Sequence, residues 1–333
     1  AERPNILWIT SEDNAAHWLG CYGNKQASTP RLDALAAGGL RFPRAYSNAP
    51  VCAVARSTIL NGAYAVTQGT QHMRSRHEIP AFYKPHASYL RSLGYYCTNN
   101  SKTDYNFKGD DRAVWDECSA KAHYKSRPAG KPFFAIFNLT ISHESNLFPE
   151  VIRKNRKQGI IPEKPRLAPA AVTIPPRPPD LPGIHNDAAI YHDCVSAMDR
   201  QVGKLLDELK ERGLADDTIV FYYADHGGAM ARGKRYLEDT GTRVPMIIHI
   251  PEKWRNLSPF KPGQAVDEPV AFVDLAPTLL SLCGIETPEQ MQGRAFLGKH
   301  RAAPRDIEFL FADRFEETEG MRRAITDGKF KYI

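Results

Sequence analysis

Four short runs of apolar residues along the chain lack the polar–apolar alternation of a strand that has one face in water. Uninterrupted apolar runs of this length are typical of strands that are covered on both faces, as in a parallel sheet. The segments predicted as buried strands are Asn5–Thr10, Phe133–Leu139, Thr218–Ala224 and Met246–Ile250.

Helical patterns separate these runs. Thr29–Gly38 has Thr29 as a predicted N-cap and Pro30 at the first helical position. Ala188–Gly213 repeats apolar residues at helical spacing and ends on glycine, and Val273–Cys283 has the same character. Strands that alternate with helices predict an α/β fold.

Two segments break this rhythm. Phe148–Gly183 holds nine of the 25 prolines and several Lys and Arg, and we expect a long surface excursion there. The last residues, Gly328–Ile333, resemble a strand that is entered and not completed. We therefore expect a main α/β domain over residues 1–305 and the start of an incomplete C-terminal subdomain over residues 306–333.

Composition narrows the class of protein. The 333 residues include 44 Lys+Arg and 38 Asp+Glu, so the net charge is +6, which suits an anionic substrate but is too small to indicate nucleic-acid binding. The six cysteines form no C-x-x-C pair, which argues against a zinc ribbon and against thioredoxin-like redox chemistry. The apolar stretches are far shorter than the ~18 residues of a membrane span.

Side chains that can bind ions or react follow the predicted strands, where open α/β sheets place their sites. Neighbouring carboxylates repel one another unless a cation lies between them, and an oxygen-rich pocket suits Ca²⁺ or Mg²⁺. Taken singly, each cluster could be a turn, a helix cap, a solvated loop or a buried thiol. The clusters are Glu12-Asp13, Cys52 with Arg56, His143, and Asp225-His226-Gly227.

Their combination resembles the type I sulfatases of the alkaline phosphatase superfamily, nearly from end to end. The segments that carry the resemblance are PNILWITSED with GCYG, TPRLDALAAGGLRF, VCAVARSTILNG, SAMDRQVGKLLDEL, TIVFYYADHG, GKRYLEDTGTRVPMII and VDLAPTLLSLCGIETPEQMQGR. The resemblance implies an alkaline-phosphatase-like sandwich: a large, mixed and mostly parallel sheet with helices on both faces, and a small C-terminal antiparallel subdomain that is cut short.

The resemblance also implies that a maturation enzyme oxidises Cys52 to formylglycine. One hydroxyl of the hydrated aldehyde would attack sulfur and expel the alcohol, and the other would then collapse to the aldehyde and eject sulfate, so two easier steps replace one hard one. Arg56 lies one helical turn after Cys52, on the same face, and would hold a formylglycine hydroxyl.

By position, the family's cation would be Ca²⁺, with Mg²⁺ as the alternative. Glutamate stands at position 12, where most relatives have aspartate. The implied ligands are Glu12, Asp13, Asp225 and His226, together with the modified Cys52.

Three further residues resemble the family's sulfate-handling groups. Lys102 would bridge nucleophile and sulfate, Lys234 would bind sulfate, and His143 would hydrogen-bond the leaving oxygen. Without the flanking motifs, Lys102 and Lys234 would be interpreted as surface charges.

Two positions depart from the family pattern. Val54 occupies the middle of a signature that normally reads C-x-P-x-R or C-x-A-x-R, and the maturation enzyme recognises that position. Asp104 stands where the family has a histidine two residues after the lysine. Asp104 could act as a base in sulfate elimination or make a structural hydrogen bond.

Outside the reaction centre, His72 and Arg74 are candidates for contacts with a sugar or a second sulfate, and His185 is a candidate of the same kind. A polar surface loop is the alternative for these residues.

The expected function is hydrolysis of sulfate esters on a sulfated carbohydrate, such as carrageenan or a glycosaminoglycan, by a periplasmic or secreted protein whose signal peptide has been removed. The expected partners are that substrate and the maturation enzyme, with no nucleic acid and no membrane span. The alternatives are a phosphoester or phosphonate hydrolase of the same superfamily, which would favour a Thr or Ser nucleophile and two metals, and an inactive sulfatase-like carbohydrate-binding protein.

Overall fold

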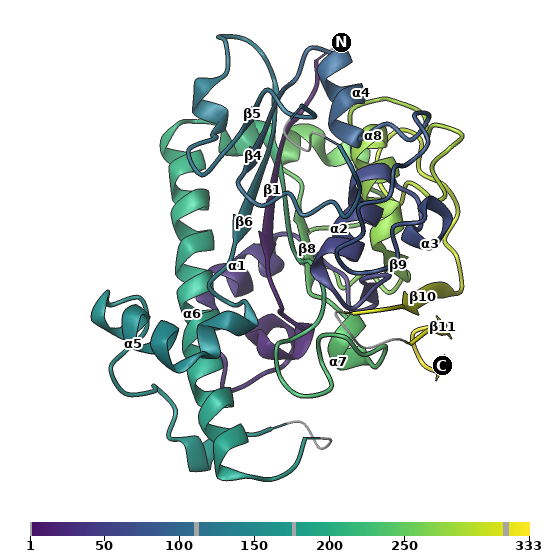
Figure 1. Ribbon diagram of the computed structural model, residues 1–333. Coiled ribbons are helices and arrows are strands. Elements are labelled where there is room, and N and C mark those ends of the chain that lie inside the picture. The colour runs from purple at the N-terminus through teal and green to yellow at the C-terminus, as the bar shows by residue number, and fades with distance from the viewer. Residues whose placement is uncertain (1, 110–112, 175–177, 316–319) are drawn as a thin grey trace.

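A computed structural model describes residues 2–109, 113–174, 178–315 and 320–333 (Figure 1). Among these residues, seven strands form the main sheet in the order β2-β8-β7-β1-β6-β4-β5. The strands are β1 (Asn5–Ser11), β2 (Leu40–Arg41), β4 (Tyr96–Asn100), β5 (Glu117–Cys118), β6 (Phe133–Leu139), β7 (Thr218–Ala224) and β8 (Met246–His249).

The sheet is mixed and mostly parallel, as the sequence predicts. Strand β1 lies between β6 and β7 and is parallel to both, and β4 is parallel to β6 and β5. Strand β8 runs antiparallel to β7, and the short β2 runs antiparallel to β8. All four predicted strands are confirmed within one residue of their expected ends.

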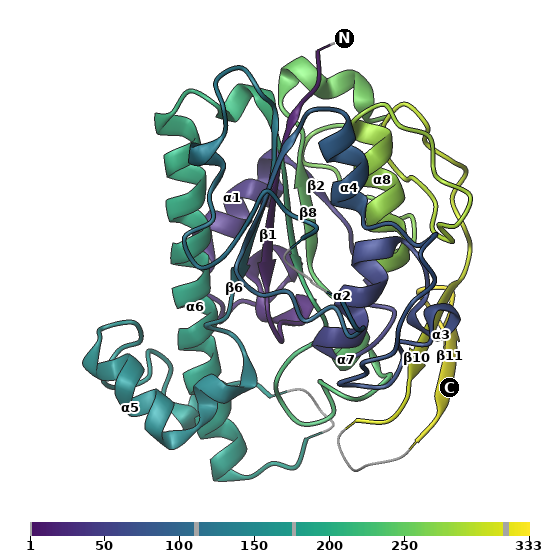
Figure 2. The ribbon, with the colours of Figure 1, turned by 45° about the horizontal axis from the view of Figure 1, so that its top comes forward.

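Helices cover both faces of this sheet (Figures 1 and 2). Along β1, Ile6 and Trp8 face one hydrophobic core, and Leu7 and Ile9 face the other, so the run is apolar throughout because both of its faces are buried. The first core is closed by α2 (Cys52–Asn61), α4 (His86–Ser92) and α8 (Leu275–Leu282), and the second by α1 (Pro30–Gly38) and α6 (Pro182–Glu211).

The C-terminal residues form a separate antiparallel sheet, which confirms that expectation. Its described strands are β10 (Glu308–Ala312), β11 (Arg322–Thr326) and β12 (Lys331–Tyr332). A two-residue parallel pair joins β3 (Ala45–Tyr46) to β9 (Val270–Ala271). The described helices also include the short α3 (Ala65–Gln68) and α7 (Asp239–Thr242). The division of the chain into two domains at residue 305 stays a prediction.

The segment expected as an irregular excursion is partly helical, which corrects the sequence-based prediction. Helix α5 occupies Pro149–Lys157, and α6 begins at Pro182, six residues before the predicted start. A proline opens α5, an acidic residue stands in its first turn and basic residues in its last, an arrangement that complements the helix dipole. Figure 2 shows α5 standing off the long helix α6 at the edge of the molecule.

No helix in the described part of the chain is both long enough and apolar enough to cross a bilayer. The six cysteines are all free thiols in this structure.

Candidate active site

The polar clusters meet at one edge of the sheet because their strands are parallel neighbours. Ser11, at the end of β1, is in register with Ala224 at the end of β7 and with Leu139 at the end of β6. The residues that follow these three strands therefore emerge side by side, and the Asp225 N–H donates to the Ser11 carbonyl over 3.0 Å. Polar groups far apart in the chain are thus held at one place by the backbone pairing.

Three of the four predicted side-chain metal ligands converge. One ligand atom from each of Asp13, Asp225 and His226 lies within 4.8 Å of the others, and all three residues are buried. His226 Nδ1 lies 2.9 Å from the Gly227 carbonyl, which can only accept a hydrogen bond, so Nδ1 carries a proton and neutral His226 has its lone pair on Nε2. Nε2 faces Asp13 Oδ1 at 2.9 Å and Asp225 Oδ1 at 3.6 Å.

This arrangement fits a divalent cation. Two buried carboxylates and one imidazole lone pair point to the same space, and the fixed tautomer is the one a metal-binding histidine needs. Burial alone would lower the pKa of His226, but the Asp225 and Asp13 carboxylates raise that pKa to about 10. Without a metal ion, these carboxylates therefore favour a protonated His226.

Glu12 is oriented differently. Its Oε1 lies 2.8 Å from Lys102 Nζ and 3.5 Å from the Arg56 guanidinium, so the carboxylate faces two cations. Glu12 is not in the group of described residues whose ligand atoms lie within 4.8 Å of one another. Its role as a metal ligand stays a prediction, and the observed contacts give it a second role in orienting Lys102 and Arg56.

Cys52 and Arg56 both lie on α2, as the predicted helical spacing requires. Cys52 is the first residue of the helix and is only 2% exposed. Its thiol is one of the groups that raise the pKa of His226, after the Asp225 and Asp13 carboxylates. Arg56 Nη2 lies 3.2 Å from Asp225 Oδ2, and its Nη1 donates to Asn138 Oδ1 over 2.6 Å. The α2 N-terminus thus delivers the candidate nucleophile to the edge where the carboxylates collect.

Cations gather around the same carboxylates. Arg56 contacts Asp225 and Glu12, Lys102 contacts Glu12, and Lys234 contacts Asp13, although these cations come from three distant parts of the chain. Side chains with this arrangement can hold a tetrahedral anion against a nucleophile, because they supply positive charge on several sides without having to move.

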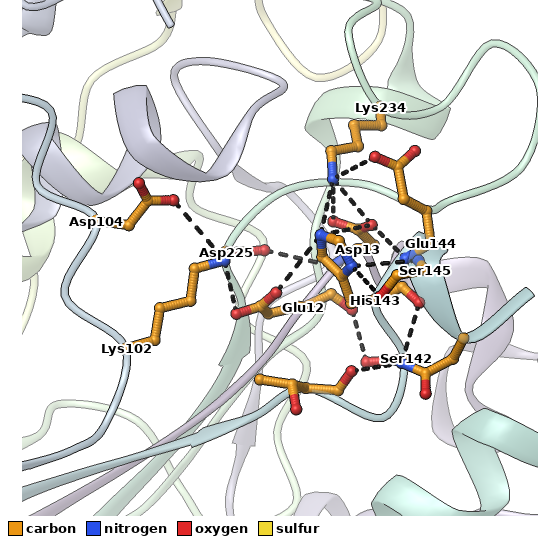
Figure 3. A network of polar contacts seen from close by, with 12 residues as sticks. Glu12, Asp13, Lys102, Asp104, Ser142, His143, Glu144, Ser145, Asp225 and Lys234 are labelled. Carbon is orange, nitrogen blue, oxygen red and sulfur yellow. Dashed lines mark hydrogen bonds and ion pairs between the residues drawn. The ribbon is translucent and has the colours of Figure 1, made fainter. Parts of the chain in front are cut away.

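Lys234 and His143 lie together on the other side of the cluster (Figure 3). Lys234 Nζ lies 3.1 Å from Asp13 Oδ2, 3.0 Å from Glu144 Oε1 and 3.2 Å from His143 Nε2. Burial alone would lower the pKa of Lys234, but these carboxylates raise it, so the ammonium stays charged at neutral pH. His143 Nδ1 accepts the Ser145 N–H, and the Lys234 ammonium lies at His143 Nε2, so the ring is held between these two groups.

The residues predicted at the rim are connected to this cluster to different extents. Arg74 Nη1 contacts Asp104 Oδ1 over 2.6 Å, and Asp104 Oδ2 lies 3.8 Å from Lys102 Nζ. Asp104 is therefore an acidic neighbour of Lys102, and Arg74 partly neutralises it. The side-chain contacts described for His185 are with Asp180 and the 169–172 backbone, and the His72 carbonyl accepts a hydrogen bond from Asn106. The described contacts do not link His185 or His72 to the catalytic cluster.

Three residues of the site were not predicted from the sequence. Asn138 orients Arg56, Glu144 binds Lys234, and the Tyr191 hydroxyl donates to the Asp13 carbonyl. Asn138 is a polar residue at the end of an otherwise apolar strand, and Glu144 adjoins His143, so both had a weak signal in the chain. Tyr191 lies inside the helical pattern of α6, and no signal in the sequence set it apart from the other aromatic residues of the chain.

Comparison with known proteins places these observations in context. Residues 4–285 match the family model described as Sulfatase. The whole chain is 37% identical to an ulvan-active sulfatase of Formosa agariphila, of which it covers 61% of the length. The fold is similar to that of a putative sulfatase from Bacteroides thetaiotaomicron (TM-score 0.78, 19% identity, 99% of this chain and 82% of that one). It is also similar to the phosphonate monoester hydrolase of Agrobacterium radiobacter (TM-score 0.71, 18% identity, 99% and 87%).

Proposed function

The chain belongs to the sulfatase family, and from this premise we propose that it hydrolyses sulfate esters on a sulfated carbohydrate. The observation that carries the proposal is the arrangement of Arg56, Lys102 and Lys234 around the buried carboxylates, beside the helix that begins with Cys52. A carbohydrate is the favoured substrate class because the relative that is 37% identical is described as ulvan-active.

Asp13, Asp225 and His226 would hold the divalent cation, for which Ca²⁺ is the first candidate and Mg²⁺ the second. When bound, the cation would polarise a sulfate oxygen and favour the ionised form of the nucleophile. The chain itself keeps the site ready: burial alone would raise the pKa of Asp225, but His226 and Arg56 beside it lower that pKa. The ligand carboxylates therefore remain ionised at neutral pH.

Cys52 would carry the nucleophile after its conversion to formylglycine by a maturation enzyme, and the hydrated aldehyde supplies the attacking hydroxyl. Arg56 is fixed by Asp225 and Asn138, so its guanidinium can orient that hydroxyl without rearranging. Val54 lies buried in α2, where it packs in the core beside Cys52 and does not obstruct the site.

Lys102 and Lys234 would neutralise the sulfate oxygens from two sides. Glu12 holds the Lys102 ammonium, and Asp13 and Glu144 hold that of Lys234, so both cations are oriented before substrate arrives. Ser145 and Lys234 hold the His143 ring with Nε2 at the cluster, where it would hydrogen-bond the leaving oxygen. Asp104, paired with Arg74, would be the candidate base for sulfate elimination.

The alternative within the superfamily is hydrolysis of a phosphonate or phosphate ester. The similar fold of a phosphonate monoester hydrolase is the observation that supports this alternative. The family match and the Cys52–Arg56 pair on α2 favour sulfate. The other rival, an inactive carbohydrate-binding protein, is disfavoured because Lys102, His143 and Lys234 all face the cluster.

The test is release of inorganic sulfate from sulfated oligosaccharides by protein made in a host that converts cysteine to formylglycine, with matched phosphate and phosphonate esters as competitors. The mass of the peptide that contains Cys52 reports whether conversion occurred. Converted protein that releases phosphate from those esters but no sulfate would overturn the proposal. A polymeric substrate is too large to enter a cell, which is why we also propose a periplasmic or secreted location.

A further inference from the structure

A second concave surface lies away from the catalytic cluster, where α5 and the loop after it pack against α6. It contains a cavity of about 500 Å³, and the lining of this cavity includes three arginines. Arg156 comes from α5, Arg166 from the following loop and Arg200 from α6. We refer to it as the arginine cavity.

These guanidinium groups are only partly neutralised by the protein, and Arg166 and Arg200 are exposed to solvent. No carboxylate of the described residues forms an ion pair with Arg156, Arg166 or Arg200. Arg166 donates to the Gln26 carbonyl over 2.6 Å and Arg200 to the Ile160 carbonyl over 2.7 Å, and carbonyls carry no net charge. Arg156 Nε is buried and has no hydrogen-bond partner in the described chain. This donor is therefore available to an anion that enters the cavity.

The acidic residues of the cavity offset only part of this charge, since one buried carboxylate, Asp193, interacts with all three arginines. Asp193 is buried in the wall, where its carboxylate accepts the Arg166 backbone N–H over 3.3 Å, and Glu163 is exposed at the rim. The surrounding segment, residues 148–183, contains seven Lys and Arg against three Asp and Glu. The excess of positive charge is therefore local, and the arginine cavity lies within it.

The cavity is mechanically connected to the reaction centre. The 3₁₀ turn Glu144–Leu147, which carries the Lys234 partner Glu144, leads directly into α5. Asn155, near the end of α5, donates to Asn146 in that turn over 2.9 Å. Arg156 follows Asn155 and therefore lies close to the turn that carries Glu144, so one polymer chain could reach both the arginine cavity and the catalytic cluster.

We propose that the arginine cavity binds a sulfate group on a distant unit of the same polysaccharide whose ester lies at the catalytic cluster. This assignment rests on the proposed function for its ligand class. Guanidinium groups bind sulfate-like oxyanions through paired N–H donors, so arginines from separate elements can grip one group with directional hydrogen bonds.

The test measures binding of dextran sulfate, with uncharged dextran, carboxymethyl dextran and single-stranded DNA as comparison polymers. Arg156→Ala and Arg200→Ala should each weaken the Kd for dextran sulfate roughly tenfold. Arg153→Ala removes an exposed cation from the same helix but not from the cavity, and should change the Kd less than twofold. Hydrolysis of a small aryl sulfate should be unchanged in all three variants.

Equal weakening by Arg153→Ala and Arg156→Ala would overturn the inference, since the binding would then be diffuse attraction. Equally tight binding of carboxymethyl dextran or DNA, with the same sensitivity to Arg156→Ala, would also overturn the assignment to sulfate. Loss of dextran sulfate binding in the cavity variants, in protein that releases no sulfate from any ester, would uphold the cavity and refute the proposed function. Because Arg156 and Arg200 lie on different helices, agreement between the two variants excludes a local unfolding of either one.

Discussion

Two separate buried clusters of acidic and basic side chains occur in this fold, and they differ in how far their cations compensate the burial of their carboxylates. The catalytic cluster contains Asp13, Asp225 and Glu12 with Arg56, Lys102, Lys234 and His226. The second, which we call the support cluster, joins the C-terminal sheet to the start of α8. Its members are Asp274, Glu308, Arg294 and Arg305.

The carboxylates respond to burial differently in the two places. In the catalytic cluster burial would raise the pKa of Asp13, but His226, Lys234 and His143 lower it well below its usual range. In the support cluster burial and the neighbouring Asp274 raise the pKa of Glu308 to about 8, and Arg305 does not compensate. In the catalytic cluster the neighbouring cations outweigh the effect of burial on the carboxylate pKa, and in the support cluster they do not.

The partners of the cations explain this difference. In the support cluster Arg294 donates to the Pro269 carbonyl, and Asp274 accepts the backbone N–H groups of Arg294 and Ala271, so the charges tie loops together. In the catalytic cluster the cations pair with carboxylates that also form the candidate metal site. Buried charge alone does not indicate an active site; charged side chains that converge at the ends of several strands, beside a candidate nucleophile, do.

The largest expected effect distinguishes Cys52, in the catalytic cluster, from Cys283, a buried cysteine outside it. Cys52→Ala should lower kcat/KM for an aryl sulfate by about 10⁴-fold or more, because it removes the nucleophile. Cys283→Ala, at the end of α8 and also buried, should cost about 1 kcal/mol of stability and leave turnover unchanged. Initial rates and urea unfolding of both variants check this, and full activity in Cys52→Ala would remove Cys52 from the mechanism.

The next effect concerns stability at the support cluster. Arg305→Ala leaves Asp274 and Glu308 buried without their shared partner and should lower the free energy of unfolding by about 3 kcal/mol. Arg212→Ala, which breaks an exposed pair on α6, should cost only about 0.5 kcal/mol. Urea denaturation measures both. A large loss of aryl sulfate turnover in folded Arg305→Ala protein would contradict the division between the two clusters.

A smaller effect is expected within the catalytic cluster. Glu144→Gln removes one charged partner of Lys234 and should lower kcat/KM for an aryl sulfate roughly tenfold, since Lys234 keeps Asp13 but is less firmly held. Glu150→Gln, on the exposed surface of α5, is the matched control and should have no effect. Equal rates for the two variants would show that Lys234 does not depend on Glu144.

The sequence predicted those parts of the fold and site that depend on local patterns. Continuous apolar runs located the strands, and the polar residues directly after them located Asp13, Asp225 and His226. Strand β4, with the sequence YCTNN, was not predicted because it lacks such a run. Helix α5 was missed because prolines dominate the surrounding segment.

Side-chain direction could not be predicted. Adjacent residues Glu12 and Asp13 point to different partners, and only the structure shows that Asp13 joins the ligand group while Glu12 faces Lys102 and Arg56. The support cluster was missed entirely, since Asp274 and Glu308 lie 34 positions apart and no strand end or motif links them.

The last prediction uses pH to distinguish the two clusters. Glu308 has its ordinary pKa near 4.5 when unfolded and about 8 when folded, so the folded protein retains a proton that the unfolded chain releases. Stability from this group is therefore present below pH 4.5 and is lost as the pH rises toward 8, by about 1 kcal/mol per pH unit. Glu308→Gln keeps the shape and the neutral charge and should flatten this decline. Urea unfolding of both proteins at pH 5, 6, 7 and 8 tests it. Parallel stability profiles would mean that Glu308 is ionised in the folded protein and that the support cluster is as well compensated as the catalytic one.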